Sequence, residues 1–319
     1  MSDAKQELRE LVVISGKGGT GKTSLVAAFA ALAQNTVFCD LDVDVPDLHI
    51  ILRPKPRISS PFMGGNKARV RSADCIRCGQ CKDVCRFDAV RDKGTGYEVD
   101  EALCEGCGVC VALCPEKAMD FPEARCGEWH ISQTRFGPML HAALAPGQEN
   151  SGRLVSLLKK EARDLAKKEG YTTILCDGSP GIGCPVISSL AGATVAVIVT
   201  EPSLSGRHDL ERVAGVCRHF RLPFGLVINR WDLNPEGSAA LEAFCRDSGI
   251  TVFGRIPFDA DMLRATAQSL AATELHTQLR DTIVQLWQNI CHFRPATSVT
   301  LRPYIPAAPL LPDIITSSL

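Results

Sequence analysis

The chain has 319 residues, of which 45% are hydrophobic, so it can bury one large core and a small second unit. Its formal net charge of −1 gives no electrostatic reason to expect a nucleic-acid or anionic-membrane partner. Residues 1–10 lack the basic, apolar and cleavage regions of a signal peptide, and apolar runs such as residues 194–200 are too short to span a bilayer. We therefore expect a soluble, cytoplasmic protein without a stable membrane anchor. In such a chain, fifteen cysteines predict metal ligands rather than disulfides.

The first predicted elements are a buried strand (VVIS, 12–15), a glycine-rich loop (GKGGTGKTS, 16–24) and an apolar helix that begins LVAAFAALA. This order is the context of a P-loop, in which backbone amides and a helix N-terminus face phosphate oxygens. Lys22 is expected to reach the β- and γ-phosphates, and Thr23 to offer its hydroxyl to Mg²⁺. The predicted nucleotide-binding residues of the loop are Gly16, Lys17, Gly18, Gly19, Thr20, Gly21, Lys22, Thr23 and Ser24.

A second lysine, Lys17, stands early in this loop, where an ordinary Walker A motif does not require one. The loop resembles that of the deviant Walker A family: the MinD/ParA partitioning ATPases, the nitrogenase iron protein and the Mrp-type iron–sulfur carrier ATPases. The resemblance implies a homodimer in the ATP state, in which Lys17 reaches the partner's phosphates and is catalytic together with Lys22. A solvated loop lysine is the alternative.

Aspartates follow two further predicted strands. NTVFCDLDVDVPDLH (35–49) contains Asp40 and Asp42 and resembles the family's switch I. By that resemblance Asp42 orients the attacking water and is catalytic, while Asp40 supports Mg²⁺ without touching it. For Asp44 and Asp47 we favour a simpler role as helix caps.

YTTILCDGSPGIGCPV (171–186) ends its strand in Asp177, which resembles the Walker B aspartate that binds Mg²⁺ through water. Gly181 follows in a flexible turn that can sense the γ-phosphate, as the order–disorder switches of nucleotide-binding proteins do.

Eight cysteines between residues 75 and 114 form two copies of one pattern, 29 residues apart. Such spacing wraps three thiolates around one cubane, and the fourth cysteine reaches the other cluster. We therefore predict two [4Fe–4S] clusters, with the ligand sets Cys75, Cys78, Cys81, Cys114 and Cys104, Cys107, Cys110, Cys85. Zinc knuckles are the alternative, but zinc sites usually separate their cysteine pairs by a longer loop. The segment resembles a bacterial two-cluster ferredoxin, except that Arg86 stands where the second motif has Pro115. That arginine could raise the potential of the cluster near it.

Later strands at 194–200, 224–229 and 252–257 alternate with helices near 151–169, 205–220, 237–248 and 273–291. This alternation predicts an α/β fold with a doubly wound, mainly parallel sheet that binds its ligand at the strand C-termini.

Family resemblance makes Asn229 the residue that reads the base and Pro257 part of a second base-contacting loop. Residues 229–232 (NRWD) also approximate the guanine-reading motif of GTPases. The deviant loop with Lys17 favours ATP.

We predict four segments: residues 1–60 and 123–294 form the ATPase domain, 61–122 an inserted α+β ferredoxin-like domain, and 295–319 a proline-rich, flexible tail. An apolar segment that docks on a partner is the alternative for this tail. The borders 53–67 and 121–129 are rich in proline, glycine and charge, which is typical of linkers. Glycine and proline residues interrupt the stretch 134–152, which is typical of a loop. Its polar residues His141, Glu149 and Asn150 either contact a partner or nucleotide or lie in a solvated loop.

Among the other cysteines, Cys184 lies just past the turn of Gly181, which is the predicted second switch; relatives hold a bridging cluster between dimer halves in this region. No second candidate ligand for such a bridging cluster lies near Cys184 in the sequence. Buried packing is predicted for Cys39, Cys176, Cys217, Cys245 and Cys291.

The whole arrangement resembles the MinD-like ATPases with an inserted ferredoxin domain. The implied cofactors are ATP, Mg²⁺ and two [4Fe–4S] clusters, and the implied partner is a redox or metal-cluster-bearing protein. Two functions stay open: coupling of nucleotide state to electron transfer or docking, and ATP-driven maturation or delivery of a metal cluster. Permanent ferredoxin clusters favour the first. A spatial-positioning ATPase would need membrane or DNA affinity, which the charge pattern does not indicate.

Overall fold

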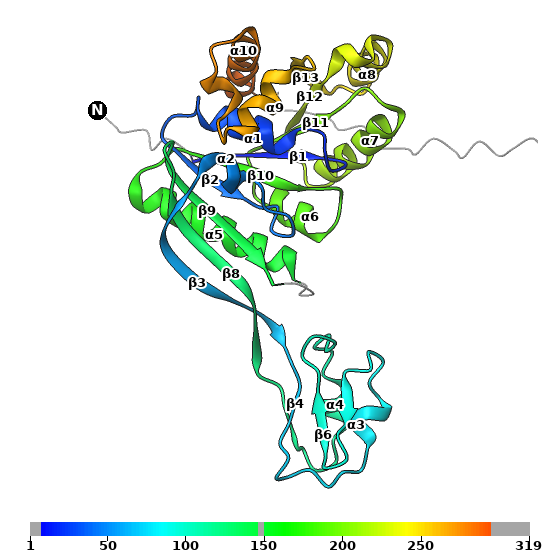
Figure 1. Ribbon diagram of the computed structural model, residues 1–319. Helices are drawn as coiled ribbons and strands as arrows, with labels where there is room; N and C mark the ends of the chain where they lie inside the picture. Colours follow the sequence, from blue (N-terminus) through cyan, green and yellow to red (C-terminus); the bar gives the residue numbers. More distant parts are fainter. Residues whose placement is uncertain (1–7, 146–149, 295–319) are drawn as a thin grey trace, which may run out of the picture.

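The computed structural model describes residues 8–145 and 150–294, and its main body is a nine-stranded sheet (Figure 1). In spatial order the strands are β13 (Thr251–Ile256), β12 (Phe224–Asn229), β11 (Val195–Thr200), β1 (Arg9–Ser15), β10 (Thr173–Pro180), β2 (Thr36–Asp40), β9 (Pro138–Leu144), β8 (Glu123–Gln133) and β3 (Lys55–Asn66). The strands from β13 to β9 run parallel, whereas β8 and β3 pair antiparallel. The predicted α/β fold with a mainly parallel sheet is confirmed.

Helices cover both faces of this sheet, because its parallel strands carry apolar side chains on both sides. Neighbouring residues Val12 and Val13 of β1 belong to the two opposite cores. One core includes α1 (Lys22–Ala30), α2 (Leu48–Leu52), α9 (Ala260–Ala267), η2 (Ala272–Glu274) and α10 (Gln278–His292). The other includes α5 (Ser151–Glu169), α6 (Cys184–Leu190), α7 (Leu204–His219) and α8 (Pro235–Asp247); a single turn, η1 (Trp231–Leu233), precedes α8. The C-termini of the parallel strands therefore open at one edge, where such sheets bind ligands.

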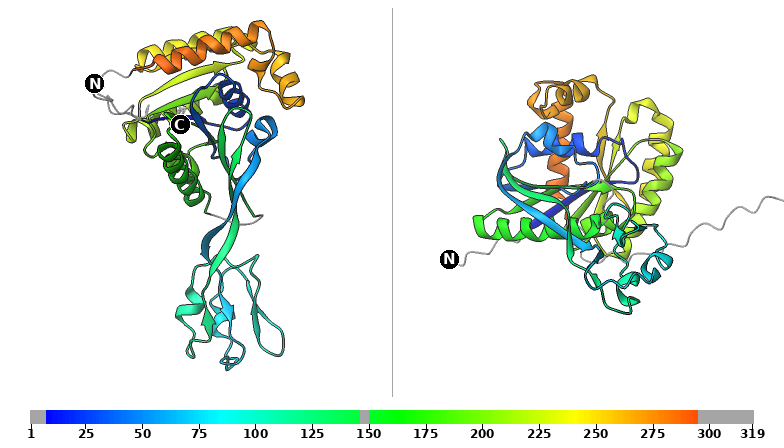
Figure 2. Two further views of the ribbon diagram at one scale, coloured as in Figure 1. Left: turned by 90° about the vertical axis from the view of Figure 1, so that its left-hand side faces the viewer. Right: turned by 60° about the horizontal axis from the view of Figure 1, so that its bottom comes forward.

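Two strands continue beyond the body as an antiparallel ribbon (Figure 2). β3 pairs with β8 from Lys55 to Asn66, whereas β9 pairs with β8 only as far as Gly127. The prediction that 53–67 and 121–129 are linkers is wrong, because these two stretches pair with each other across the insertion. The stretch 134–152 likewise contains β9 rather than a long loop.

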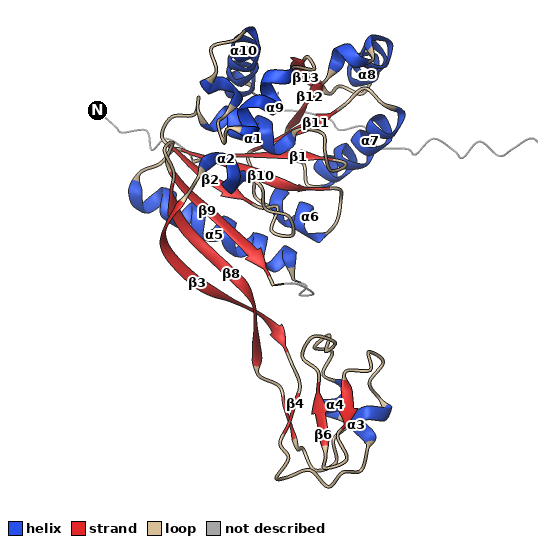
Figure 3. Cartoon of the chain, viewed as in Figure 1, coloured by secondary structure: helices blue, strands red, loops and turns tan. Residues whose placement is uncertain are grey.

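The ribbon carries a small unit of residues 67–122, shown apart from the body in Figure 3. β3 extends to Asn66, so this unit begins later than the expected border at residue 61. The unit contains two antiparallel strand pairs and two short helices: β4 (Arg69–Val70) with β7 (Met119–Asp120), β5 (Val90–Asp92) with β6 (Tyr97–Val99), α3 (Gln80–Asp83) and α4 (Val109–Ala112). Its own core is formed by Ala68, Ala89, Cys104, Cys110 and Met119.

Across residues 8–145 and 150–294, no helix is both long enough and apolar enough to cross a membrane. The expected flexible tail, 295–319, and Glu149 lie outside the described residues.

Candidate functional site

The glycine-rich loop joins the end of β1 to the start of α1. Gly19 (φ 78°) and Gly21 (φ 88°) adopt the left-handed conformation that side chains disfavour. A Cβ on Gly16 would lie 2.3 Å from the Cβ of Asp209, so the loop packs directly against α7. The backbone therefore has the form in which loop amides and the start of α1 can face one phosphate.

Lys22 lies among carboxylates at the C-terminal edge of the sheet. Its Nζ is 2.6 Å from Oδ1 of Asp177, 3.8 Å from Oδ2 of Asp42 and 3.2 Å from Oγ1 of Thr23. Burial alone would lower the pKa of Lys22, but the negative charges of Asp177 and Asp42 outweigh it and raise that pKa. Lys22 is therefore a charged group that a phosphate can bind in place of a carboxylate.

Asp40 and Asp177 are neighbours in register at the ends of β2 and β10, and both are fully buried. Burial, followed by the charge of Asp177, raises the pKa of Asp40 well above its usual value. Burial also raises the pKa of Asp42 to about 6, although the charge of Lys22 opposes this shift. Oδ2 of Asp177 is buried without a hydrogen-bond partner among the described residues. Crowded carboxylates with an unsatisfied oxygen fit a divalent cation held directly or through water.

Lys17 is held within its own chain. Its Nζ forms an ion pair with Glu201, at the end of β11, and lies 3.2 Å from Oγ of Ser205. Glu201 also lies 3.3 Å from the guanidinium of Arg230. Sequence reasoning missed Glu201, although a carboxylate directly after a buried strand, in VTEP, was a usable signal.

Asn229 is buried at the end of β12, where its Nδ2 donates to the carbonyl of Thr20 (2.7 Å). The amide of Phe258, which follows Pro257, donates to Oδ1 of Asp232 (2.6 Å). These contacts bring the two predicted base-reading segments to the edge that holds the P-loop.

Gly181 (φ 91°) lies on the same edge, and its amide donates to the carbonyl of Ser15 (2.8 Å). The predicted second switch is thus attached to the start of the P-loop.

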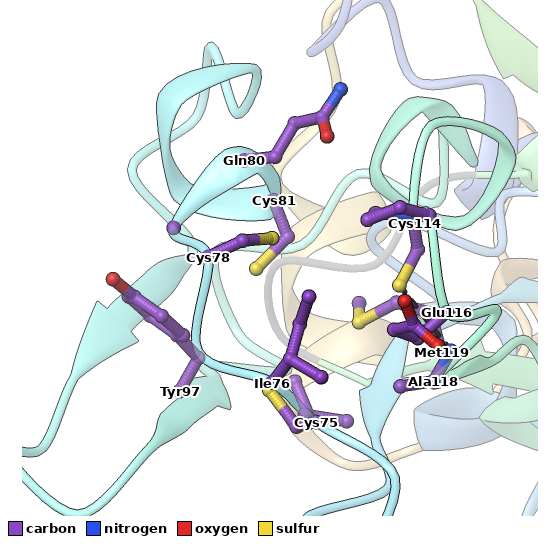
Figure 4. Close-up of a pocket in the computed structure, with 13 residues that line it drawn as sticks. Cys75, Ile76, Cys78, Gln80, Cys81, Tyr97, Cys114, Glu116, Ala118 and Met119 are labelled. Atoms are coloured by element: carbon purple, nitrogen blue, oxygen red, sulfur yellow. Dashed lines mark hydrogen bonds between the residues drawn. The ribbon is translucent and has the colours of Figure 1, made fainter.

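The first predicted cysteine set gathers around one pocket, although its members come from both motifs. The sulfur atoms of Cys75, Cys78, Cys81 and Cys114 turn toward a common hollow beside Tyr97 (Figure 4). Burial, with smaller contributions from Cys75 and Cys78, raises the pKa of Cys81. The chain thus brings the last cysteine of the second motif to the first three of the first motif.

Three cysteines of the second set meet in the core of the small unit: Cys104 and Cys110 are buried in it, and Cys85 packs against it. Burial, followed by the neighbouring thiols of Cys104, Cys107 and Cys85, raises the pKa of Cys110. Within the described ranges, no three His, Cys, Asp or Glu side chains stand close enough to hold one metal ion together.

The remaining cysteines are mostly in the cores. Cys39, Cys176, Cys217 and Cys245 are buried as predicted, and Cys291 is half-buried. Cys184 is exposed at the start of α6. Cys126, for which the sequence suggested no role, is buried in β8, and its thiol donates to the carbonyl of Gly64.

The fold and the loop define a P-loop nucleotide-binding domain. A model of the CobQ/CobB/MinD/ParA nucleotide-binding domain family matches residues 11–271, and the chain belongs to this family. An uncharacterized protein of Methanocaldococcus jannaschii is 28% identical over 289 residues, which is 90% of this chain and 98% of that one. Septum site-determining protein MinD of Pyrococcus horikoshii, solved with Mg-ADP, has a TM-score of 0.54 at 17% identity and covers 89% of this chain and 96% of its own.

One further similarity is shorter. A component of an ion-translocating oxidoreductase complex of Methanosarcina acetivorans is 31% identical over 77 residues, which is 24% of this chain and 27% of that protein. The family assignment makes the chain a MinD/ParA-like nucleotide-binding ATPase.

Proposed function

We propose that this ATPase carries two [4Fe–4S] clusters in residues 67–122, and that its nucleotide state controls their electron transfer or their docking to a redox partner. The observation that carries the proposal is the regrouping of cysteines across the repeat. Cys114 lines the pocket of the first motif's cysteines, and Cys85 packs against the core that contains Cys104 and Cys110 of the second motif. A fourth ligand contributed by the other motif is characteristic of two-cluster ferredoxins.

In a [4Fe–4S] cluster each cysteine binds a different iron, whereas the four ligands of a zinc site bind one ion. When bound, the clusters supply one-electron chemistry, and the chain supplies the thiolates and a small apolar core around them.

For the nucleotide, each proposed role follows from the position of the side chain. Lys22 binds phosphate once the nucleotide displaces the carboxylates around its Nζ. Asp177, with Thr23, holds Mg²⁺, and Asp40 supports it from the neighbouring strand. Asp42 orients the attacking water, and its pKa of about 6 keeps it mostly ionised at neutral pH.

Lys17 must leave Glu201 to reach the phosphates of a second copy, so the described arrangement suits the state before dimerisation. ATP is favoured over GTP because the P-loop carries the second lysine, Lys17, of the deviant Walker A loop.

The test is anaerobic purification followed by iron, zinc and sulfide analysis. We expect about eight irons per chain, from two four-iron clusters. Two zincs and no iron would overturn the cluster assignment. ATP turnover in the presence of an apo-acceptor separates the two functions: iron that stays with the chain supports electron transfer, whereas transfer of iron to the acceptor supports cluster delivery.

A further inference from the structure

The end of the ribbon holds one of the two cysteine loops. Lys67, the first residue after β3, donates from Nζ to the backbone carbonyl of Cys104. Its own amide donates to the carbonyl of Pro122 (3.1 Å), on the strand that leads into β8. Lys67 therefore ties both ribbon strands to the first residue of the second cysteine motif.

The internal repeat provides a comparison within the chain. Gly106 (φ 65°) and Arg77 (φ 61°) occupy equivalent positions, 29 residues apart, with the same left-handed backbone. A Cβ on Gly106 would lie 2.4 Å from the carbonyl oxygen of Asn66, the last residue of β3, whereas Arg77 is exposed. The ribbon thus packs against the loop of the second motif and leaves the matching residue of the first motif in solvent.

The other end of β3 is connected to the nucleotide site. β3 follows α2 closely in the chain, and the amide of Leu48 at the start of α2 donates to Oδ2 of Asp40 (3.2 Å). Oδ1 of Asp40 accepts from the amide of Asp42 (3.2 Å). Arg135, just after β8, donates to the carbonyl of Ile51 in α2 (2.8 Å). α2 is therefore held between the carboxylate of the magnesium site and both strands of the ribbon.

We propose that Lys67 is a positioning residue that transmits the nucleotide state to the cluster of Cys104, Cys107, Cys110 and Cys85, which makes this cluster the nucleotide-responsive one. This inference rests on the iron–sulfur clusters of the proposed function. Reduction adds one electron to the cluster and breaks no bond, so a nearby ammonium stabilises the reduced form. If α2 and β3 shift when Asp40 and Asp42 engage Mg²⁺ and nucleotide, the ammonium shifts relative to this cluster. The cluster of the first motif has no equivalent contact with the ribbon in the described structure.

The experiment is a potentiometric titration of the anaerobic full-length protein with dithionite, which donates the electrons, followed by electron paramagnetic resonance. Lys67→Met removes the ammonium and keeps the chain length, Lys67→Arg keeps a charge, and Lys93→Met is the control. Lys93 is an exposed lysine of the same unit, paired with Glu98.

We expect Lys67→Met to move one of the two reduction waves to lower potential and to leave the other in place. The expected shift is at least about threefold in the reduction equilibrium, or about 28 mV at 59 mV per tenfold change. Lys67→Arg should stay closer to the wild type, and Lys93→Met should match it. Unmoved waves, or two waves that move equally, would overturn the role of Lys67.

The nucleotide response is measured on the same samples with a non-hydrolysable ATP analogue and Mg²⁺. We expect the analogue to move the wave that Lys67→Met moves, and to move it less in that variant. A response of only the other wave would overturn the proposal. Gly106→Ala gives a second route, because its Cβ pushes the loop away from Asn66 and should move the same wave while iron content is kept. A wild-type protein without iron would instead refute the proposed function itself.

Discussion

His141 makes the junction between ribbon and sheet sensitive to acid. It lies in β9, with Nε2 2.8 Å from Oγ of Ser132 and its ring 4.9 Å from the ring of His130. Burial, followed by the charges of His130 and His49, lowers the pKa of His141 to about 4. We predict that this single side chain makes the free energy of unfolding fall between pH 7 and pH 5.

The direction follows from proton linkage. In the unfolded chain histidine has a pKa of about 6.5, so between pH 6.5 and 4 the unfolded state binds a proton that the folded state does not. The full shift to about 4 corresponds to about 3 kcal/mol at about 1.36 kcal/mol per pH unit. At pH 5 the free energy of unfolding has fallen by about 2 kcal/mol of this total. Because the side chain is partly in contact with solvent, we reduce the expected loss to about 1–2 kcal/mol.

The assay is urea unfolding of the wild type, His141→Asn and His292→Asn at pH 7 and pH 5. His292 is an exposed histidine near the end of α10, so its variant serves as the matched control. The pH-dependent loss should shrink by about 1–2 kcal/mol in His141→Asn and stay unchanged in His292→Asn. Each protein is compared with itself at pH 7 and pH 5, so any packing that the substitution removes lowers the free energy of unfolding equally at both pH values and cancels. Equal pH-dependent losses in all three proteins would refute the reasoning.

Three further predictions concern the proposed sites. Lys22→Ala should abolish nucleotide binding in a fluorescent-nucleotide titration, because the variant loses the ammonium proposed to bind phosphate and leaves the negative charge of Asp177 without its ion-pair partner. Tight residual binding would contradict this. Lys17→Ala and Asp42→Asn should still bind ATP but release little phosphate. Normal turnover by Lys17→Ala would show that Lys17 does not act on the partner's phosphates and that the chain is an ordinary P-loop ATPase. Cys78→Ser should lose chiefly one cluster, seen as about four fewer irons per chain; loss of both clusters would show that they do not form independently.

The nucleotide site could be predicted largely from the sequence, because its geometry follows from strand ends. Asp40 and Asp177 each follow a buried run, and parallel strands place their C-termini at one edge, so their position on that edge was expected, whereas their pairing in register is a finding of the structure. The doubled cysteine spacing likewise predicted that Cys114 lies near the first motif and Cys85 near the second, and the packing of these two residues agrees with that placement. Both inferences rest on local patterns with strict chemical requirements.

The ribbon could not be predicted in this way. Lys55–Asn66 contains two prolines and two glycines, which indicate a linker when the segment is considered alone. Its strand character comes from pairing with β8 on the far side of the insertion, which no local pattern records. The ion pair of Lys17 with Glu201 was missed for the same reason, since its partners are distant in sequence.

β3 is also the last strand of the sheet, and an open edge of this length would ordinarily invite a strand from another molecule. Pro56 and Pro61 remove two backbone donors from it, and Lys55 and Arg57 add positive charge at its beginning. Both features disfavour pairing of this edge with another strand. The ribbon can thus display the small unit at a distance from the ATPase body without recruiting a third strand.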